Sequence, residues 1–249
     1  MYKTGLLIVL LLGSFLSYSQ ENTSGTIVYE QVVKIEIKMD GDAAQFANMM
    51  PKERKSEKVL FFNNQQSLYE NNKASDQEDV SMNSGGANVM IKMVEPENKV
   101  FTDLNAKKQI EMREFMTRIF LIDREQNYQW KITGNQKMIH ELPCQEATAL
   151  DDEKKVVAWF CPAIPVTAGP GKYGGLPGLI LCVELDEGKN ITTVKTIDFT
   201  PVADGKIVKP EKGKKVTNEE FNKIVEEKVK EMCGQSGSGG TSIMIRIQK

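Results

Sequence analysis

The residues best suited to do chemistry are four cysteines, Cys144, Cys161, Cys182 and Cys233. No two of them form a C-x-x-C pair, and the only histidine in the chain is His140. A structural zinc site takes four cysteine or histidine ligands, usually in closely spaced pairs. The spacing therefore argues against a metal site, and it favours disulfides if the chain is exported.

Residues 1–19 have the pattern of a secretory signal peptide. An apolar run follows Lys3 and is too short to cross a bilayer, which takes about 20 residues. Small residues then precede an expected cleavage site between Ser19 and Gln20. We expect residues 20–249 to form a single domain that is periplasmic or secreted. The formal net charge of −2 offers no excess of basic residues for nucleic acid.

Two groups of residues could support hydrolysis, but neither has the partner residues that catalysis requires. His140 would need an activated Ser or Cys nearby, and no G-x-S-x-G elbow is present. Asp151 and Asp152 could act as an acid and a base, yet adjacent carboxylates in a turn usually point into water. We expect no catalytic residue and no cofactor, and we predict that the protein is not an enzyme. A hydrolase is the most distant alternative.

Methionine is frequent in the first half of the chain. Thioethers can bind Cu(I), line adaptable apolar pockets or fill gaps in a core. Met90 and Met93 alone have M-x-x-M spacing, so core filling is the favoured interpretation. The residues concerned are Met39, Met49, Met50, Met82, Met90, Met93, Met112 and Met116.

A stretch rich in glycine and proline runs from Gly169 to Gly178 and leads into an apolar strand. Glycine at this density indicates positive φ angles or close backbone approach, and each proline fixes φ. The composition suits a phosphate loop, but such a loop leads into a helix and carries Lys-Ser or Lys-Thr. Two interpretations remain, a structural crossing loop, which is favoured, and the rim of a binding site.

This stretch contains Gly175-Leu176-Pro177-Gly178-Leu179-Ile180, preceded by Gly169-Pro170. It resembles the signature of the GLPGLI family, secreted proteins of the Bacteroidetes type without an established activity. Trp130-Lys131-Ile132, Cys144-Gln145-Glu146-Ala147 and Ala158-Trp159-Phe160 also follow the family's order. Two positions depart from it, Cys161, where a small polar residue is expected, and Lys172-Tyr173, where an aromatic-rich pair is common. The resemblance implies a cell-envelope setting.

Alternating apolar residues predict a β-rich chain. A polar segment over 71–87 is expected to be a mobile loop, and Gly134-Asn135 is expected to be a turn. The expected strands are 26–39, 55–63, 66–69, 89–94, 99–103, 109–114, 118–123, 128–133, 137–140, the two arms around a turn at 151–154, 179–185, 191–199 and 242–248.

The turn at 151–154 sets a register that bears on the cysteines. It places Cys144 opposite Cys161, at a separation of about 4.5 to 5.5 Å between Cα atoms, which a disulfide can bridge. Cys182 and Cys233 are then left to form a second bridge, or to stay as buried thiols. We predict a Cys144–Cys161 disulfide from this register.

Near the C-terminus, Thr217 to Glu220 has the pattern of a capping box, so Thr217 should cap a helix. Its inner stripe is expected at Phe221, Ile224, Val225, Lys228 and Met232, and Gly234 should end it. The fold class we predict is mainly β (α+β): one large, curved antiparallel sheet or half-barrel of about ten strands, with this helix packed on it.

From this fold we expect an exported, non-enzymatic binding module of the cell envelope. A lipid or other apolar or amphipathic ligand would lie on the concave sheet face, beneath a lid formed by the helix or by residues 40–50. The alternative is a structural or accessory partner of an outer-membrane transport protein. Candidate ligand contacts are Trp130, Trp159, Tyr173, Leu176 and Pro177.

Overall fold

We describe the protein from a computed structural model, which covers residues 22–35, 37–38, 52–73, 78–84, 87–93, 95–235 and 244–245. Residues 1–19, the segment 40–50 and the side chain of Cys233 lie outside this description. Among the described residues, no helix has the length and apolar character needed to cross a membrane.

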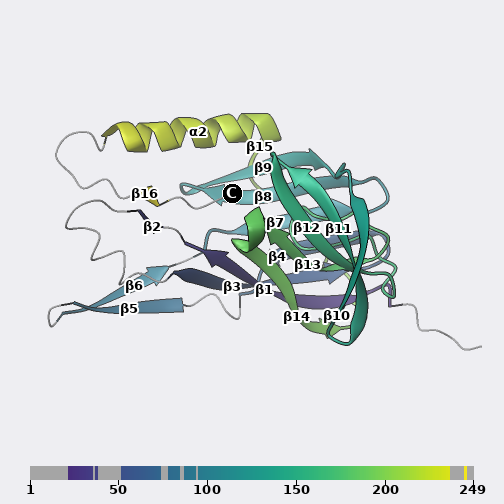
Figure 1. The fold of residues 1–249 in the computed structure, drawn as a ribbon. Coiled ribbons are helices and arrows are strands. Elements are labelled where there is room, and N and C mark those ends of the chain that lie inside the picture. Colours follow the sequence, from purple (N-terminus) through teal and green to yellow (C-terminus); the bar gives the residue numbers. More distant parts are fainter. Residues whose placement is uncertain are drawn as a thin grey trace, which may run out of the picture.

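The chain forms an open twelve-stranded sheet with strand order β10-β11-β12-β13-β14-β1-β3-β4-β7-β8-β9-β15 (Figure 1). Neighbouring strands are antiparallel except β15, which runs parallel to β9. The predicted fold class is confirmed. The strands are β1 Gly25–Lys34, β3 Glu53–Phe62, β4 Gln66–Asn71, β7 Asn98–Asp103, β8 Lys108–Phe115, β9 Arg118–Glu125, β10 Lys131–Ile139, β11 Leu142–Asp151, β12 Lys154–Cys161, β13 Leu179–Leu185, β14 Asn190–Asp198 and β15 Lys214–Thr217.

Two short ribbons accompany the main sheet. β5 (Glu78–Ser84) pairs with β6 (Ala87–Met93), and β2 (Ile37–Lys38) pairs with β16 (Met244–Ile245). The prediction of a loop over 71–87 was therefore wrong for residues 78–84, because backbone pairing within a hairpin does not require apolar side chains. The strand predicted over 26–39 ends at Lys34.

The expected turn at Gly134-Asn135 is instead an irregularity within one strand, β10. The register against β11 shifts between Ile132 and Gln136, and Gly134 has a positive φ of 87°. The Glu146 carboxylate binds the extra residues, with its Oε1 2.7 Å from Thr133 Oγ1 and 3.1 Å from Asn135 Nδ2. This carboxylate therefore ties the side chains of the irregular segment to β11.

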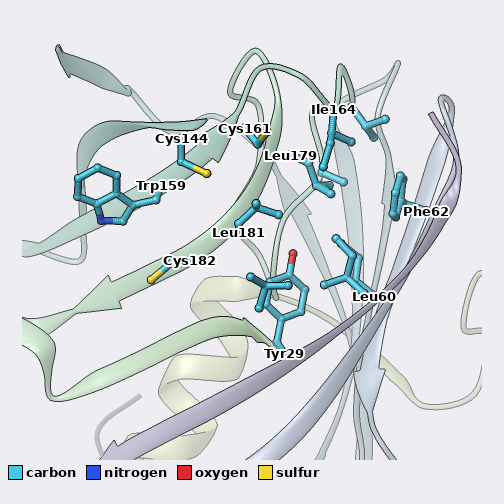
Figure 2. Close-up of a cluster of buried hydrophobic side chains, with 14 of the residues drawn as sticks. Tyr29, Leu60, Phe62, Cys144, Trp159, Cys161, Ile164, Leu179, Leu181 and Cys182 are labelled. Atoms are coloured by element: carbon cyan, nitrogen blue, oxygen red, sulfur yellow. The ribbon is translucent and has the colours of Figure 1, made fainter. Parts of the chain in front are cut away.

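The concave side of the sheet is occupied by a core in which β1 and β3 face β12 and β13 (Figure 2). Tyr29 is fully buried there, and its hydroxyl donates a hydrogen bond of 2.7 Å to the carbonyl of Ile180. We call this cluster the concave core. Its buried members are Ile27, Tyr29, Leu60, Phe62, Leu104, Cys144, Trp159, Cys161, Ile164, Val166, Ala168, Leu179, Leu181, Cys182 and Val194.

The other face of β12 is also covered. A second cluster, the outer core, holds alternate residues of β12 together with the end of the Gly-rich stretch and residues just before β10. Its buried members are Ala147, Val156, Ala158, Phe160, Tyr173, Leu176, Ile180 and Val183, with Tyr128, Trp130 and Leu185 packed against them. A strand buried on both faces has apolar residues at consecutive positions, as Val156 to Cys161 do.

Helix α2 (Asn218–Gln235) packs on β9 and β15 rather than over the concave core. The capping box is confirmed, since Glu220 N donates to Thr217 Oγ1 at 3.2 Å and Thr217 N donates to a Glu220 carboxylate oxygen at 2.9 Å. Phe221 is 1% exposed and makes edge-on ring contacts with Phe115 and Phe120. The helix continues through Gly234, which was expected to end it.

The register of β11 and β12 is the predicted one, running from Asp151 opposite Lys154 to Gln145 opposite Phe160. Cys144 and Cys161 are the next residues on each strand. In this structure Cys144, Cys161 and Cys182 are buried, unbridged thiols. The disulfide stays a prediction. A Cys182–Cys233 bridge would need the helix end beside β13, whereas α2 packs on β9 and β15.

The segment from residue 162 to residue 178 crosses from β12 to β13 and closes one end of both cores. It is held by the backbone, with Leu179 N donating to Ile164 O at 3.0 Å, and Ile180 N to Ala168 O at 3.0 Å. At its end Gly178 has a φ of 154°, and a Cβ there would lie 2.4 Å from the carbonyl oxygen of Cys161. This close backbone approach is why glycine is needed at that position.

Replacing Gly178 with alanine should therefore destabilise the protein by about 3 kcal/mol, from overpacking added to backbone strain. Gly171→Ala is the matched control, because Gly171 also has a positive φ, 61°, but open space around it. The control should lose only about 1–2 kcal/mol. Urea unfolding of both variants measures the difference, and equal losses would contradict a close-packed role for Gly178.

Candidate functional site

A cleft of about 1770 Å³ lies beside the outer core. One wall comes from β7, β8 and β9, and the opposite wall from the turn between β11 and β12. The connector between β14 and β15 and the start of α2 complete it. The lining residues are Gln66, Phe101, Asp103, Ala106, Lys108, Gln109, Ile110, Asp123, Arg124, Glu125, Asn127, Tyr128, Gln129, Thr148, Ala149, Leu150, Asp151, Asp152, Lys155, Lys172, Ile207, Val208, Lys209, Asn218 and Glu219.

Asp151 organises the turn-side wall. Lys172 Nζ lies 2.8 and 2.9 Å from its two carboxylate oxygens. The Tyr173 hydroxyl donates to Oδ2 at 2.8 Å, and the Tyr128 hydroxyl donates to Oδ1 at 3.4 Å. One carboxylate therefore joins the hairpin turn, the crossing segment and the chain before β10.

The pKa values of these groups follow from their surroundings. Burial would raise the pKa of Asp151, but hydrogen bonds and charge from Lys172, with the hydrogen bonds from Tyr173 and Tyr128, outweigh it and lower that pKa. Burial and the neighbouring Asp151 charge raise the pKa of both tyrosines. Asp151 is therefore a carboxylate at neutral pH, and the tyrosines are neutral donors.

The crossing segment is also tied to the β8–β9 wall. Gln109 on β8 donates to the Lys172 carbonyl at 3.1 Å, and its amide also contacts Thr102 Oγ1 at 3.1 Å. Trp130 Nε1 donates to the Gly174 carbonyl at 2.8 Å. These contacts hold the two walls of the cleft together through backbone carbonyls of one loop.

A buried charge stands behind the β8–β9 wall. Glu111 is 2% exposed, and one of its carboxylate oxygens lies 2.9 Å from Arg124 Nη2. Arg113 pairs with the other oxygen, and Asn98 Nδ2 donates to it at 3.3 Å. Arg124 lines the cleft and shares the single negative charge of Glu111 with Arg113, so this cluster keeps a net positive charge beside the cleft.

The rest of the lining mixes both charge signs with apolar side chains. The connector that brings Ile207 and Val208 to the cleft crosses the outer side of the sheet, where Lys206 Nζ lies 4.3 Å from the Phe61 ring centre. Apolar side chains and polar groups thus face the same space, which suits an amphipathic ligand.

The residues that the sequence suggested as ligand contacts do not all lie at one site. Tyr173 binds Asp151, and Trp130 packs beside Tyr128, whose ring centre is 5.6 Å away. Leu176 is buried in the outer core. Pro177 is exposed. Trp159 lies in the concave core, on the opposite face of β12, so the two tryptophans do not form one ligand floor.

The sequence predicts that Asp151 is a turn residue whose carboxylate points into water. That interpretation holds for the exposed Asp152 but not for Asp151, whose side chain is 17% exposed. Strand alternation was the available signal, because Ala147, Ala149 and Asp151 share one face of β11. His140 does not line the cleft; its Nε2 lies 3.2 Å from the Val194 carbonyl.

Metal ligation finds no support in the described ranges, where no group of three or more histidine, cysteine, aspartate or glutamate side chains is arranged to hold an ion.

Asp151→Asn should destabilise the protein by about 1–3 kcal/mol at pH 7, because hydrogen bonds to a charged partner are lost. The folded-state pKa is lowered, so the stabilisation is present above the unfolded pKa near 4 and disappears as the pH falls through the folded value. Asp152→Asn is the control and should stay near wild type. Urea unfolding at pH 7 and pH 3 tests this; the loss should be smaller at pH 3 than at pH 7, and an equal loss at both pH values would contradict the assignment.

Comparison with known proteins finds structures with a similar fold but does not identify an activity. Two solved structures of PNGF-II, in space groups P21 and C2, are similar with TM-scores of 0.54 and 0.53 and identities of 11% and 12%. Each match covers 82% of this chain and 33% of PNGF-II. The chain thus spans about a third of that protein's length, and the likeness supports a common β-sheet fold. No protein of curated function matches the sequence.

A family model described as "Protein of unknown function (Porph_ging)" matches residues 26–182. The match includes β1, β3, β4, the cleft walls and the whole Gly-rich crossing segment. The chain therefore belongs to the Porph_ging family of proteins of unknown function.

Proposed function

We propose that the protein is an exported, non-enzymatic binding module of the cell envelope, and that its ligand lies in the cleft beside Asp151. The single observation that carries this proposal is the position of the open space. The concave core is filled with side chains, whereas the cleft of about 1770 Å³ is open beside the outer core. A volume of this order exceeds what a drug-sized ligand needs.

The lining favours an amphipathic ligand over a bare acyl chain. Phe101, Ile110 and Val208 offer apolar contact, while Gln129, Thr148 and Lys155 offer donors and acceptors. Asp151 and Lys172 neutralise each other, so the wall they form is polar without a strong net charge. A ligand with an apolar portion and several hydrogen-bonding groups would satisfy both kinds of surface.

The proposal does not assign a reaction to the cleft. Asp151 accepts three side-chain donors and is held as a carboxylate, so it is poorly suited to give or take a proton at neutral pH. A binding role uses the same rigid network to fix the shape of the wall.

The test is native mass spectrometry of the protein purified from its own host, with organic extraction of any bound molecule. Leu150→Glu places a charge on the turn-side wall and Val208→Glu on the connector that completes the cleft, at side chains that are 71% and 58% exposed. Each should reduce the bound fraction about tenfold, since an apolar contact is replaced by a charge that must be desolvated.

Met138→Glu is the matched control, because Met138 is 63% exposed on β10 and does not line the cleft. It should retain the ligand at the wild-type level. Protein that carries no ligand under gentle extraction would count against a binding module and favour the alternative, an accessory partner of an outer-membrane transport protein. A bound molecule that survives both cleft substitutions would place the site elsewhere.

A further inference from the structure

The concave core contains three thiols on three successive strands. Cys144 lies on β11, Cys161 on β12 and Cys182 on β13 (Figure 2). A local irregularity brings Cys182 inward, since the β12–β13 register shifts at this point and both Leu181 and Cys182 enter the concave core.

Strand geometry selects one pair. Extending the β11–β12 register by one residue places Cys144 opposite Cys161 on adjacent antiparallel strands, within the range that a disulfide spans. Cys182 lies opposite Trp159 on β13, two strands from Cys144, which corresponds to about 9.5 Å. Cys161 lies opposite Leu179, so Cys182 is displaced from Cys161 by three residues along β13. Neither separation allows a bridge without moving the backbone.

The two opposed thiols differ in their surroundings. Cys144 Sγ lies 3.5 Å from the Leu142 carbonyl, an acceptor that favours a protonated thiol. Interaction with Cys161 and burial raise the pKa of Cys144, whereas interaction with Cys144 and with the backbone N–H groups of Ala163 and Ile164 lowers the pKa of Cys161. These surroundings favour a thiolate at Cys161 and a thiol at Cys144.

We infer that Cys144 and Cys161 form a redox-active dithiol, in which Cys161 attacks a disulfide-bearing oxidant and Cys144 resolves the mixed disulfide. The Cys161 thiolate displaces one thiolate from the oxidant and becomes covalently bound to its other sulfur. Cys144 then loses its proton and attacks Cys161 Sγ, releasing the second thiolate. The net change is one protein disulfide, one proton and two oxidant thiolates.

The position of Cys161 gives this reaction a structural consequence. Cys161 is the last residue of β12, and its carbonyl lies against Gly178 at the far end of the crossing segment. Cys161 is 0% exposed, so an oxidant reaches it only when the chain opens locally, and the exposed residues Pro162 and Ala163 follow it directly. A bridge to Cys144 would fix the root of the segment that carries Lys172 and Tyr173 to the cleft.

The pKa of Cys161 supports the assigned order of attack. The hydrogen bond from Cys144 lowers this pKa, burial opposes the effect, and the N–H groups of Ala163 and Ile164 lower it further. The rate of reaction with a disulfide should therefore rise with pH and reach its plateau at a pH below about 8.5, the usual pKa of a free cysteine.

The experiment treats the folded, reduced full chain with oxidised glutathione and follows the products by intact mass and peptide mapping. We expect loss of two hydrogens, a linked Cys144–Cys161 peptide and no lasting adduct. Cys144→Ser should stall as a glutathione adduct on Cys161, and Cys161→Ser should leave Cys144 unmodified. Cys182→Ser is the matched control from the same core and should react as the wild type does.

The bridged protein should also melt roughly 5–10 °C higher than the reduced protein, because the disulfide closes a chain loop. If the serine variants fail to fold, alkylation of the oxidised wild type still identifies the bridged pair. A bridge to Cys182, a lasting adduct on the wild type, or a folded protein that stays reduced while urea-unfolded protein oxidises would overturn the inference.

Discussion

Strand β12 is buried on both of its faces, and the rest of the architecture follows from that constraint. One face supplies Trp159 and Cys161 to the concave core, and the other supplies Ala158 and Phe160 to the outer core. A sheet covered on one side only could leave its second face to water. Here the crossing segment has to pass the end of β12 and contribute to both cores, which requires the backbone approach at Gly178.

Two carboxylates near this doubly buried strand are bound by other side chains. Asp151 is bound by Lys172, Tyr173 and Tyr128, and buried Glu111 is bound by two arginines. Such pairs add little net stability relative to apolar residues, yet removing one partner leaves a buried group unpaired. They therefore act as positioning devices, each within its own wall of the cleft, and the hydrogen bond from Gln109 to the Lys172 carbonyl joins the two walls.

The comparisons reach as far as the fold and the family. A likeness at 11% identity that covers a third of PNGF-II shows how strands are arranged, and it does not carry a site from one chain to the other. The case for a binding module instead depends on local features of this chain, the filled concave core and the open, chemically mixed cleft.

Local patterns in the sequence determined the β-rich fold, the capped helix and the β11–β12 register, because alternation, capping and tight turns act over a few residues. They did not separate Trp130 from Trp159, or Asp151 from Asp152. Which face of β12 a side chain occupies, and whether a carboxylate is buried, depend on segments brought together from distant parts of the chain. Of the two departures from the expected family pattern, Cys161 could be paired with Cys144 from the hairpin register alone, because both arms of that hairpin are local in sequence. The pairing of Lys172-Tyr173 with Asp151 could not be predicted, because the crossing segment returns to β11 only in the tertiary structure.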